Sequence, residues 1–377
     1  MAALLDAANR KITIGQFEQA ATLLDQVERL KPTGSYDMRL RFICGAVFAG
    51  LDDSKQAVSF LAQAQGIAKD ADDFDSFIVI TLKTAEVIHN ALEYRSALDY
   101  YKIAYSAFET KYGEHPEQNV PLNIVLLSFL GRQLWTLGLL EEAHGKLAAV
   151  MTLWREMNSG AKTKELNPFV SNTLWQLGLT LRAQSDMRDG DAGYIRRALR
   201  HMRDADDLKR ACGDEDYKIG RLYIQTAELY LDLAELNAQR NSHSAATSNR
   251  NEAKNFAKIA LEYIAPTEDI HGKLMARFAL LRCDITARSQ QSLIRNSKRI
   301  EATFKQLEHE SAPLKDRGLI AKIATLRAEW YLSLGDMVTA RASLEFAFEG
   351  FEAGAPGQST RAERLLRIID GAAPPDR

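Results

Sequence analysis

The segment LGRQLWTLGLLEEAHGKLAAV, residues 130–150, contains two apolar patterns separated by a glycine. On both sides of Gly138, large apolar residues recur at the three- and four-residue spacing of an amphipathic helix. Gly131 and Ala143 stand where the two helices would cross, and a larger side chain there would push them apart. The spacing therefore predicts a hairpin of two antiparallel helices. Its large packing residues are Leu130, Leu134, Leu140, Leu147 and Val150.

The same spacing recurs along nearly the whole chain, which is typical of a repeat architecture. It predicts an all-α fold: a single α-solenoid over residues 1–371, built from about eight antiparallel helix pairs, with a flexible tail at 372–377. A capping helix is expected at 359–370. Polar stretches at 183–197 and 238–251 are interpreted as long loops within the fifth and sixth pairs. The pairs are expected at approximately 1–34, 38–71, 77–112, 123–158, 171–211, 217–266, 271–311 and 316–353.

The first copy, LLDAANRKITIGQFEQAATLLDQVERLKP at residues 4–32, resembles the tetratricopeptide repeat (TPR) family. Leu4 and Lys11 depart from the family pattern, which has tryptophan and tyrosine at those two places. The resemblance implies a right-handed superhelix in which the first helix of each pair lines a concave groove. The residues that match are Ala8, Gly15, Phe17, Ala20, Leu24, Val27 and Pro32.

Composition and charge limit the classes of function. Of the 377 residues, 46% are hydrophobic and 26% are charged, which is typical of a chain that forms a core. The formal net charge of -2 would hold neither nucleic acid nor an anionic membrane by bulk charge. No apolar run approaches a membrane span, and the N-terminal residues are too polar for a secretory signal. With three widely separated cysteines, the chain is expected to be cytoplasmic.

The sequence contains none of the motifs that would indicate an enzyme. Phosphate-binding and dinucleotide-binding glycine motifs are missing, as are H-E-x-x-H and C-x-x-C. The seven histidines are scattered, and none has a second metal ligand at the appropriate spacing on the same helix face. We therefore expect no catalytic residues, no metal and no cofactor.

Direct nucleic-acid binding is not expected either. The first repeat begins at the first residues of this sequence, which leaves no room for a preceding DNA-binding domain. A basic stripe at residues 196–203 could contact phosphates. The favoured interpretation is a solvated helix face whose arginines pair with the acidic residues that follow. The arginines are Arg196, Arg197, Arg200 and Arg203, and the acidic residues are Asp204, Asp206 and Asp207.

The TPR resemblance implies which side chains of the first helices face the groove. Tryptophan would provide a flat apolar anchor and arginine a clamp for carboxylates, as in a peptide-binding surface. Alternatively, Trp135 and Trp175 pack between neighbouring pairs. The candidate groove residues are Asn9, Arg39, Glu86, His89, Arg132, Trp135, Trp175, Arg182, Arg221 and Glu228.

Chaperone-binding members of the TPR family use lysine, asparagine and arginine at defined groove positions to hold an acidic tail. Of the corresponding positions here, only Asn9 fits, so this chain is not expected to bind such a tail. The residues that depart from the clamp are Leu5, Ala46, Leu82 and Glu86.

Two hypotheses of function remain open. The first is a non-enzymatic scaffold or adaptor that binds a partner protein or peptide in the groove. The second is a regulatory sensor whose superhelix closes on a small peptide or metabolite and controls a transcriptional or signalling output. Homo-oligomerisation through the end repeats is a further possibility, and no membrane partner is expected.

Overall fold

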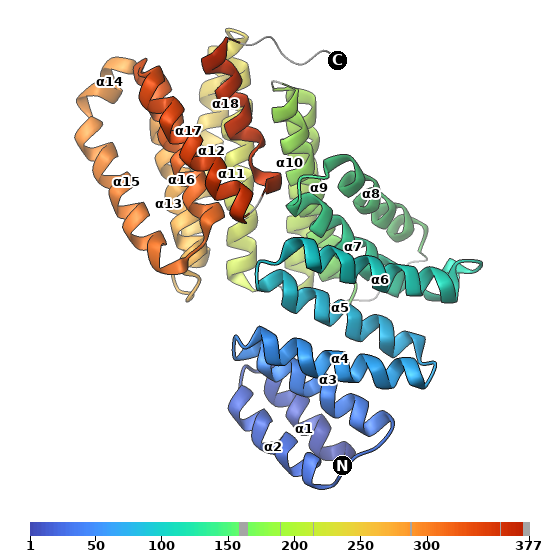
Figure 1. Ribbon diagram of the computed structural model, residues 1–377. Helices are drawn as coiled ribbons and strands as arrows, with labels where there is room; N and C mark the ends of the chain where they lie inside the picture. Colours follow the sequence, from blue (N-terminus) through green and yellow to red (C-terminus); the bar gives the residue numbers. More distant parts are fainter. Residues whose placement is uncertain (158–164, 189, 214, 287–288, 355, 372–377) are drawn as a thin grey trace. The chain divides into compact units, whose positions relative to one another are not determined.

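The structure is a computed structural model that describes residues 1–157, 165–188, 190–213, 215–286, 289–354 and 356–371. Within these ranges the chain is helical and contains no β-strand (Figure 1). Consecutive helices pack as antiparallel pairs, which confirms the predicted all-α fold of about eight helix pairs. The pairs are α1 (Ala2–Thr13) with α2 (Phe17–Arg29), α3 (Ser35–Gly50) with α4 (Ser54–Asp70), α5 (Phe74–Asn90) with α6 (Tyr94–Tyr112), α9 (Asn167–Met187) with α10 (Ala192–Cys212), α11 (Asp216–Gln239) with α12 (His243–Ile264), α13 (Ile270–Thr286) with α14 (Gln290–Arg295) and α15 (Ser297–Ser311), and α16 (Arg317–Leu334) with α17 (Met337–Gly354). The helices of the fourth predicted pair, α7 (Val120–Thr136) and α8 (Leu140–Glu156), follow α6 in the chain.

Contacts within the chain group these helices into two compact units, Met1–Gln133 and Leu134–Arg377. The first unit contains α1–α6, the short 3-10 helix η1 (Pro116–Asn119) and most of α7. The second contains the remaining helices, and the boundary falls within α7. Within each unit, a helix packs mainly on its partner and on the next pair, as expected of a repeat array.

Small residues at the helix crossings explain the repeat spacing. Ala8 of α1 and Ala20 of α2 are both fully buried where these helices meet. In the second pair, a Cβ atom on Gly45 of α3 would lie 2.6 Å from Leu61 Cγ and 3.1 Å from the Ala57 carbonyl oxygen of α4. A larger residue at these sites would push the two helices apart, which confirms the physical reason given for the pattern.

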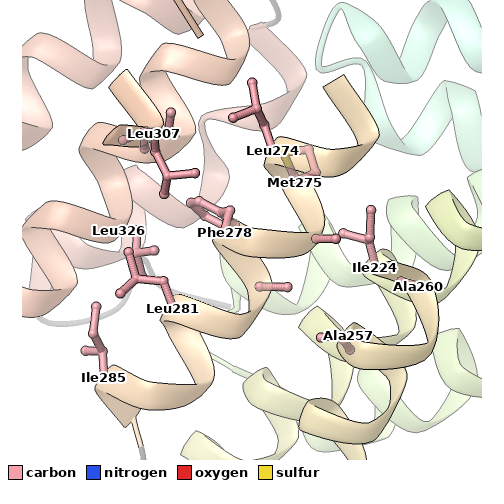
Figure 2. Close-up of a cluster of buried hydrophobic side chains, with 14 of the residues drawn as sticks. Ile224, Ala257, Ala260, Leu274, Met275, Phe278, Leu281, Ile285, Leu307 and Leu326 are labelled. Atoms are coloured by element: carbon pink, nitrogen blue, oxygen red, sulfur yellow. The ribbon is translucent and has the colours of Figure 1, made fainter. Parts of the chain in front are cut away.

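A large core cluster of the second unit surrounds α13. Figure 2 shows side chains of α13 between those of α11 and α12 on one side and those of α15 and α16 on the other. Phe278 is 6% exposed and Leu326 is 1% exposed in this cluster. The seventh pair, whose sequence matches the repeat pattern poorly, is therefore fully integrated into the packing.

The long loop predicted at 183–197 is wrong, because α9 continues to Met187 and α10 begins at Ala192. Three of the polar residues that suggested a loop, Gln184, Ser185 and Asp186, are buried and have partners. The Ser185 hydroxyl donates to the Asp191 carbonyl at 3.1 Å and accepts from the Asp191 amide at 2.9 Å. Asp186 is bonded by arginines of a distant helix, so its polarity does not interrupt α9.

The long loop predicted at 238–251 is also wrong. Helix α11 ends at Gln239, and α12 begins at His243 after a tight turn in which Asn241 has a φ of 58°. Most of the polar residues that follow lie on the exposed face of α12, while Ala246 and Ala253 are buried on the opposite face. Seven residues separate these two alanines, which corresponds to two helical turns.

The capping helix expected at 359–370 is present as α18 (Thr360–Asp370), preceded by the 3-10 helix η4 (Pro356–Gln358). It packs against α17 and also against α9, far back in the sequence. The second unit is thus closed by its C-terminal helix. The predicted tail at 372–377 lies outside the described residues. Within the described ranges, none of the helices combines the length and hydropathy needed to cross a bilayer.

Candidate binding cavity in the second unit

A cavity of about 140 Å³ lies within the second unit. Side chains of the first helices of consecutive pairs form its walls, and the segment that leads into α18 completes them. Apolar and charged residues alternate around it. The lining residues are Trp135, Leu179, Arg182, Ala183, Asp186, Gln225, Glu228, Phe278, Arg282, Lys322, Thr325, Leu326, Glu329, Phe351, Gly357, Gln358, Thr360 and Arg361.

Three of the candidate groove residues meet in this cavity: Trp135, Arg182 and Glu228. Arg182 of α9 forms an ion pair with Glu228 of α11 and also donates from Nε to Asp232 Oδ2 at 2.7 Å. The indole nitrogen of Trp135 is buried and has no hydrogen-bond partner among the described residues. The TPR register thus identified one wall of the cavity, formed by α9 and α11.

Buried ion pairs connect α11, α13 and α16. Arg282 of α13 is 3% exposed and donates from Nη2 to Asp232 Oδ1 at 2.7 Å. Its Nε also donates to Glu329 Oε2 of α16 at 3.2 Å. Asp232 therefore bonds both Arg182 and Arg282. Buried ion pairs of this kind cost desolvation energy that only good geometry and complete pairing offset.

Helix α18 adds three arginines to the network. Arg361 donates from Nε to Glu329 Oε1 at 2.9 Å and from Nη2 to Glu235 Oε2 of α11 at 2.5 Å. Arg364 lies 3.4 Å from carboxylate oxygens of both Asp186 and Glu235. Arg367 donates to the backbone carbonyl of Asp186 at 3.0 Å. These contacts attach α18 to the inner residues of α9, α11 and α16.

The network shifts the pKa values of its carboxyl groups in opposite directions. Burial alone would raise the pKa of Asp232, but Arg182 and Arg282 outweigh it and hold the pKa far below its usual range. The pKa of Glu329 is lowered in the same way by Arg282 and Arg361. Burial raises the pKa of Asp186 despite its nearby arginines.

Lys322 of α16 differs from the other cations of the cavity. It is partly buried in the wall, and no carboxylate of the described residues lies within ion-pair distance of it. Burial lowers the pKa of Lys322, and Glu228 and Asp316 oppose this effect only from a greater distance. Each of the three lining arginines, by contrast, pairs with at least two carboxylates.

The candidate residues of the first unit mostly pair with its own side chains. Arg39 of α3 pairs with Asp6 of α1, and Glu86 of α5 pairs with Lys83 at 2.9 Å. Asn9 of α1 is exposed. None of them belongs to the cavity of the second unit.

His89 and Arg132 also have partners within the first unit. His89 Nδ1 lies 2.6 Å from Gln133 Oε1, and Gln133 Nε2 donates to the Tyr94 carbonyl at 2.6 Å. Arg132 donates to the Tyr101 hydroxyl at 3.4 Å. Burial, reinforced by the positive charge of Arg132, lowers the pKa of His89 to about 4. His89 is therefore neutral at pH 7.

Trp175 and Arg221 lie in the second unit but outside the cavity. The Lys209 ammonium of α10 lies 5.7 Å from the ring centroid of Trp175 of α9, so this tryptophan packs within its own helix pair. Arg221 of α11 holds Asp269 with two hydrogen bonds of 2.7 and 2.6 Å. Asp269 in turn accepts a hydrogen bond from the Gly272 amide at the start of α13.

Sequence reasoning missed Lys322, Thr325 and Glu329, although a signal for them was present. The groove-facing places of each first helix are counted from the small residue at the helix crossing. If Ala328 is that residue in the eighth pair, the counting that gave Arg182 and Glu228 also gives these three residues. The arginines of α18 carried no such signal, since their partners lie as far as 181 residues back in the sequence.

The basic stripe of α10 is arranged differently from the interpretation given above. Asp206 pairs with Arg210 at 3.0 Å, one turn further along the helix. The four arginines of the stripe are exposed, and none forms an ion pair with a carboxylate in the part of the chain that the structure describes. Arg197 instead lies over the Tyr194 ring at 5.2 Å. The expected pairing with the aspartates is therefore wrong, and Asp206 instead binds Arg210 and the Tyr223 hydroxyl.

Comparison with known proteins agrees with the fold. No protein-family model matches the sequence, and no curated protein sequence matches it. Among solved structures, the apo form of the quorum sensor NprR from B. thuringiensis superposes with a TM-score of 0.57 at 13% identity, over 93% of this chain and 86% of that one. A Rap protein complexed with Competence and Sporulation Factor gives a TM-score of 0.52 at 12% identity, over 98% and 96% of the two chains.

A third similar structure is the Rap conjugation gene regulator of the plasmid pLS20 in complex with the Phr* peptide. Its TM-score is 0.50 at 14% identity, and the match covers 98% of this chain and 97% of that chain. At this identity the likeness concerns the fold. The chain has a helical-repeat fold of the tetratricopeptide type.

Proposed function

We propose that this chain is a non-enzymatic, peptide-binding regulatory protein of the TPR family, acting in the cytoplasm. One observation carries the proposal: the cavity of the second unit, where Trp135 and paired charges line the inner side of consecutive repeats. Aromatic walls with a few placed polar groups are typical of ligand sites. The cavity has room for one anchoring residue of a peptide, with the rest lying along the helices.

The similar structures support a peptide ligand over other classes. One of them is a Rap regulator in complex with the Phr* peptide, and another is the quorum sensor NprR. Both resemble this chain over most of its length. The sequence contains no catalytic motif, and the cavity carboxylates all bond arginines, which leaves none of them poised as a general base.

Within this proposal, the sensor mode has a specific basis. Five helices contribute to one network of ion pairs and hydrogen bonds around the cavity, and three of its arginines belong to α18. A ligand that fills the cavity would contact both the α9–α16 wall and the segment leading into α18. Ligand binding would therefore change the strength with which α18 is held, and this is a means of controlling an output. A scaffold mode requires only that the partner's peptide be bound.

The proposal is tested with a synthetic pool of random heptapeptides. The full chain is equilibrated with the pool and separated by size exclusion, and the retained peptides are identified by mass spectrometry. We expect enrichment of a defined subset by the wild type and its loss in Trp135→Ala, because the anchor wall is removed.

Trp154→Ala is the matched control, because Trp154 lies on α8 and does not line the cavity. It is expected to retain the same peptides as the wild type, and far-UV circular dichroism verifies that both variants are folded. Equal enrichment by the wild type and Trp135→Ala would show that the peptides do not bind in the cavity. No enrichment by any of the three proteins would contradict peptide binding.

A further inference from the structure

The cations and carboxylates of the cavity do not pair completely. Four cations line it, Arg182, Arg282, Lys322 and Arg361, together with three carboxylates. Two carboxylates behind the wall, Asp232 and Glu235, bond the arginines and not Lys322. Each of the carboxylates is thus engaged by guanidinium groups. The Lys322 ammonium remains without a bonded anion among the described residues.

The position of Lys322 keeps its charge at the cavity. Its neighbours on α16, Ala321 and Ile323, are both buried, so the lysine lies on a helix that is firmly embedded in the core. Thr325 and Glu329, one and two turns further along α16, also line the cavity. Burial lowers the pKa of Lys322, the direction expected when the surrounding groups do not fully compensate an ammonium.

The size and walls of the cavity describe the ligand group. At about 140 Å³, the space approximates an apolar cavity that holds one benzene-sized group. Apolar walls are formed by Trp135, Phe278 and Leu326. The Lys322 ammonium, which has no bonded anion among the described residues, can be paired by a group with one negative charge such as a carboxylate.

We propose that the cavity binds an apolar carboxylic acid group, with the carboxylate at the Lys322 ammonium and the apolar body between Trp135 and Phe278. The source is either the C-terminal residue of a peptide or a free small carboxylic acid. This inference rests on the proposed function for its location, and it adds the chemistry that the site selects.

Two pairs of probes distinguish the sources. The first pair is a pool of random heptapeptides with free C-terminal carboxylates and the same pool with C-terminal amides. The second is 4-methylpentanoate and phenylacetate with their amides. Binding to the full-length chain is measured by retention for the pools and by titration calorimetry for the small molecules. We expect the carboxylate forms to bind roughly tenfold or more tightly than the amides, because a charge-assisted hydrogen bond is lost.

Variants of Lys322 test the role of its charge. Lys322→Met keeps the length of the side chain and should abolish the preference for carboxylates, whereas Lys322→Arg should retain it in part. Lys102→Met is the matched control, because Lys102 is exposed on α6 in the first unit, and its preference should equal that of the wild type. The thermal unfolding of each variant confirms that it is folded.

The outcomes separate this inference from the proposed function. Equal binding of carboxylate and amide peptides overturns the inference and leaves peptide binding intact. Binding of the small acids without any peptide supports the carboxylate site and contradicts the peptide function. An unchanged carboxylate preference in Lys322→Met overturns the assignment to Lys322. Failure of every probe contradicts both proposals.

Discussion

At the scale of single residues, His89 shows how a position predicted to face the groove can serve packing. Its pKa of about 4, against an ordinary value of 6.5, results mainly from burial beside Arg132. Between these two pH values the unfolded chain binds a proton that the folded chain does not. The stabilisation is therefore complete above pH 6.5 and is lost as the pH falls towards 4.

We expect the wild type to lose about 2 kcal/mol of unfolding free energy from this group between pH 7 and pH 5. In His89→Gln the loss over this interval should be smaller by that amount. Urea unfolding at both pH values, followed by far-UV circular dichroism, measures the difference. The same pH dependence in both proteins would contradict the assignment.

Asp232 is the residue on which the buried network depends most. It bonds two arginines, and Arg282 is itself buried. Asp232→Asn would leave positive charge buried without compensation, and we expect a loss of about 3–5 kcal/mol of unfolding free energy. Asp370→Asn removes the exposed pair with Arg341 and should cost less than about 1 kcal/mol. Comparable losses in the two variants, measured by urea unfolding, would refute this ranking.

Sequence reasoning at this scale identified some cavity residues and not others, for a physical reason. Arg182 and Glu228 follow from the repeat register, because a register determines which face of a helix points inward. The partners of Asp186 could not be inferred in that way. A carboxylate in a polar stretch suggests a loop until a distant arginine is known to neutralise it.

At the scale of elements, the docking of α18 depends on a close backbone approach by η4. A Cβ atom on Gly357 would lie 2.0 Å from the Trp135 carbonyl oxygen and 2.8 Å from the Gly138 amide nitrogen. Both neighbours are backbone atoms, so they cannot move aside as the end of a side chain can. Only glycine allows this segment to lie against the turn between α7 and α8.

Gly357→Ala should therefore displace η4 and loosen α18, at a cost of about 1–3 kcal/mol. We expect faster tryptic cleavage at Arg361 and Arg364, measured by timed proteolysis and mass spectrometry. Gly145→Ala on α8 meets no atom within 4 Å and should leave the cleavage rate unchanged. If trypsin cleaves Gly357→Ala no faster than this control, the close approach of η4 is not what keeps α18 packed against its neighbours.

The helix pairs themselves were predictable, whereas the ends of α9 and α12 were not. Small residues recur with a constant spacing because the two helices of each pair must approach closely where they cross. The last turn of α9 contains Ser185 and Asp186, whose partners lie outside this helix. The first turns of α12 expose polar residues and bury few apolar ones. The spacing of Ala246 and Ala253 was a local indication that α12 begins early, but the many polar residues around them suggested a loop.

At the scale of the whole molecule, the four tryptophans all belong to the second unit. They are Trp135, Trp154, Trp175 and Trp330. Tryptophan fluorescence therefore follows that unit, while far-UV circular dichroism follows all helices. A single solenoid over 1–371 remains a prediction, and comparing the two signals tests how strongly its parts are coupled.

We expect the two signals to give different urea midpoints, because repeats are stabilised mainly by their neighbours. Leu61→Ala, which removes a fully buried side chain of the first unit, should lower the dichroism midpoint and leave the fluorescence midpoint unchanged. Leu344→Ala, equally buried in the second unit, should lower both. Equal shifts of both signals in Leu61→Ala would show one cooperative unit.

The attachment of α18 to α9 also has a consequence for synthesis. Arg367 follows Asp186 by 181 residues, so a ribosome needs roughly 10–40 s to make the residues between them. During that interval α9 and the succeeding pairs can fold, but the Asp186 carboxyl has no arginine of α18 and must stay hydrated. The newly made unit is therefore open towards water until α18 emerges. The cavity can therefore close only after α18 has been synthesised.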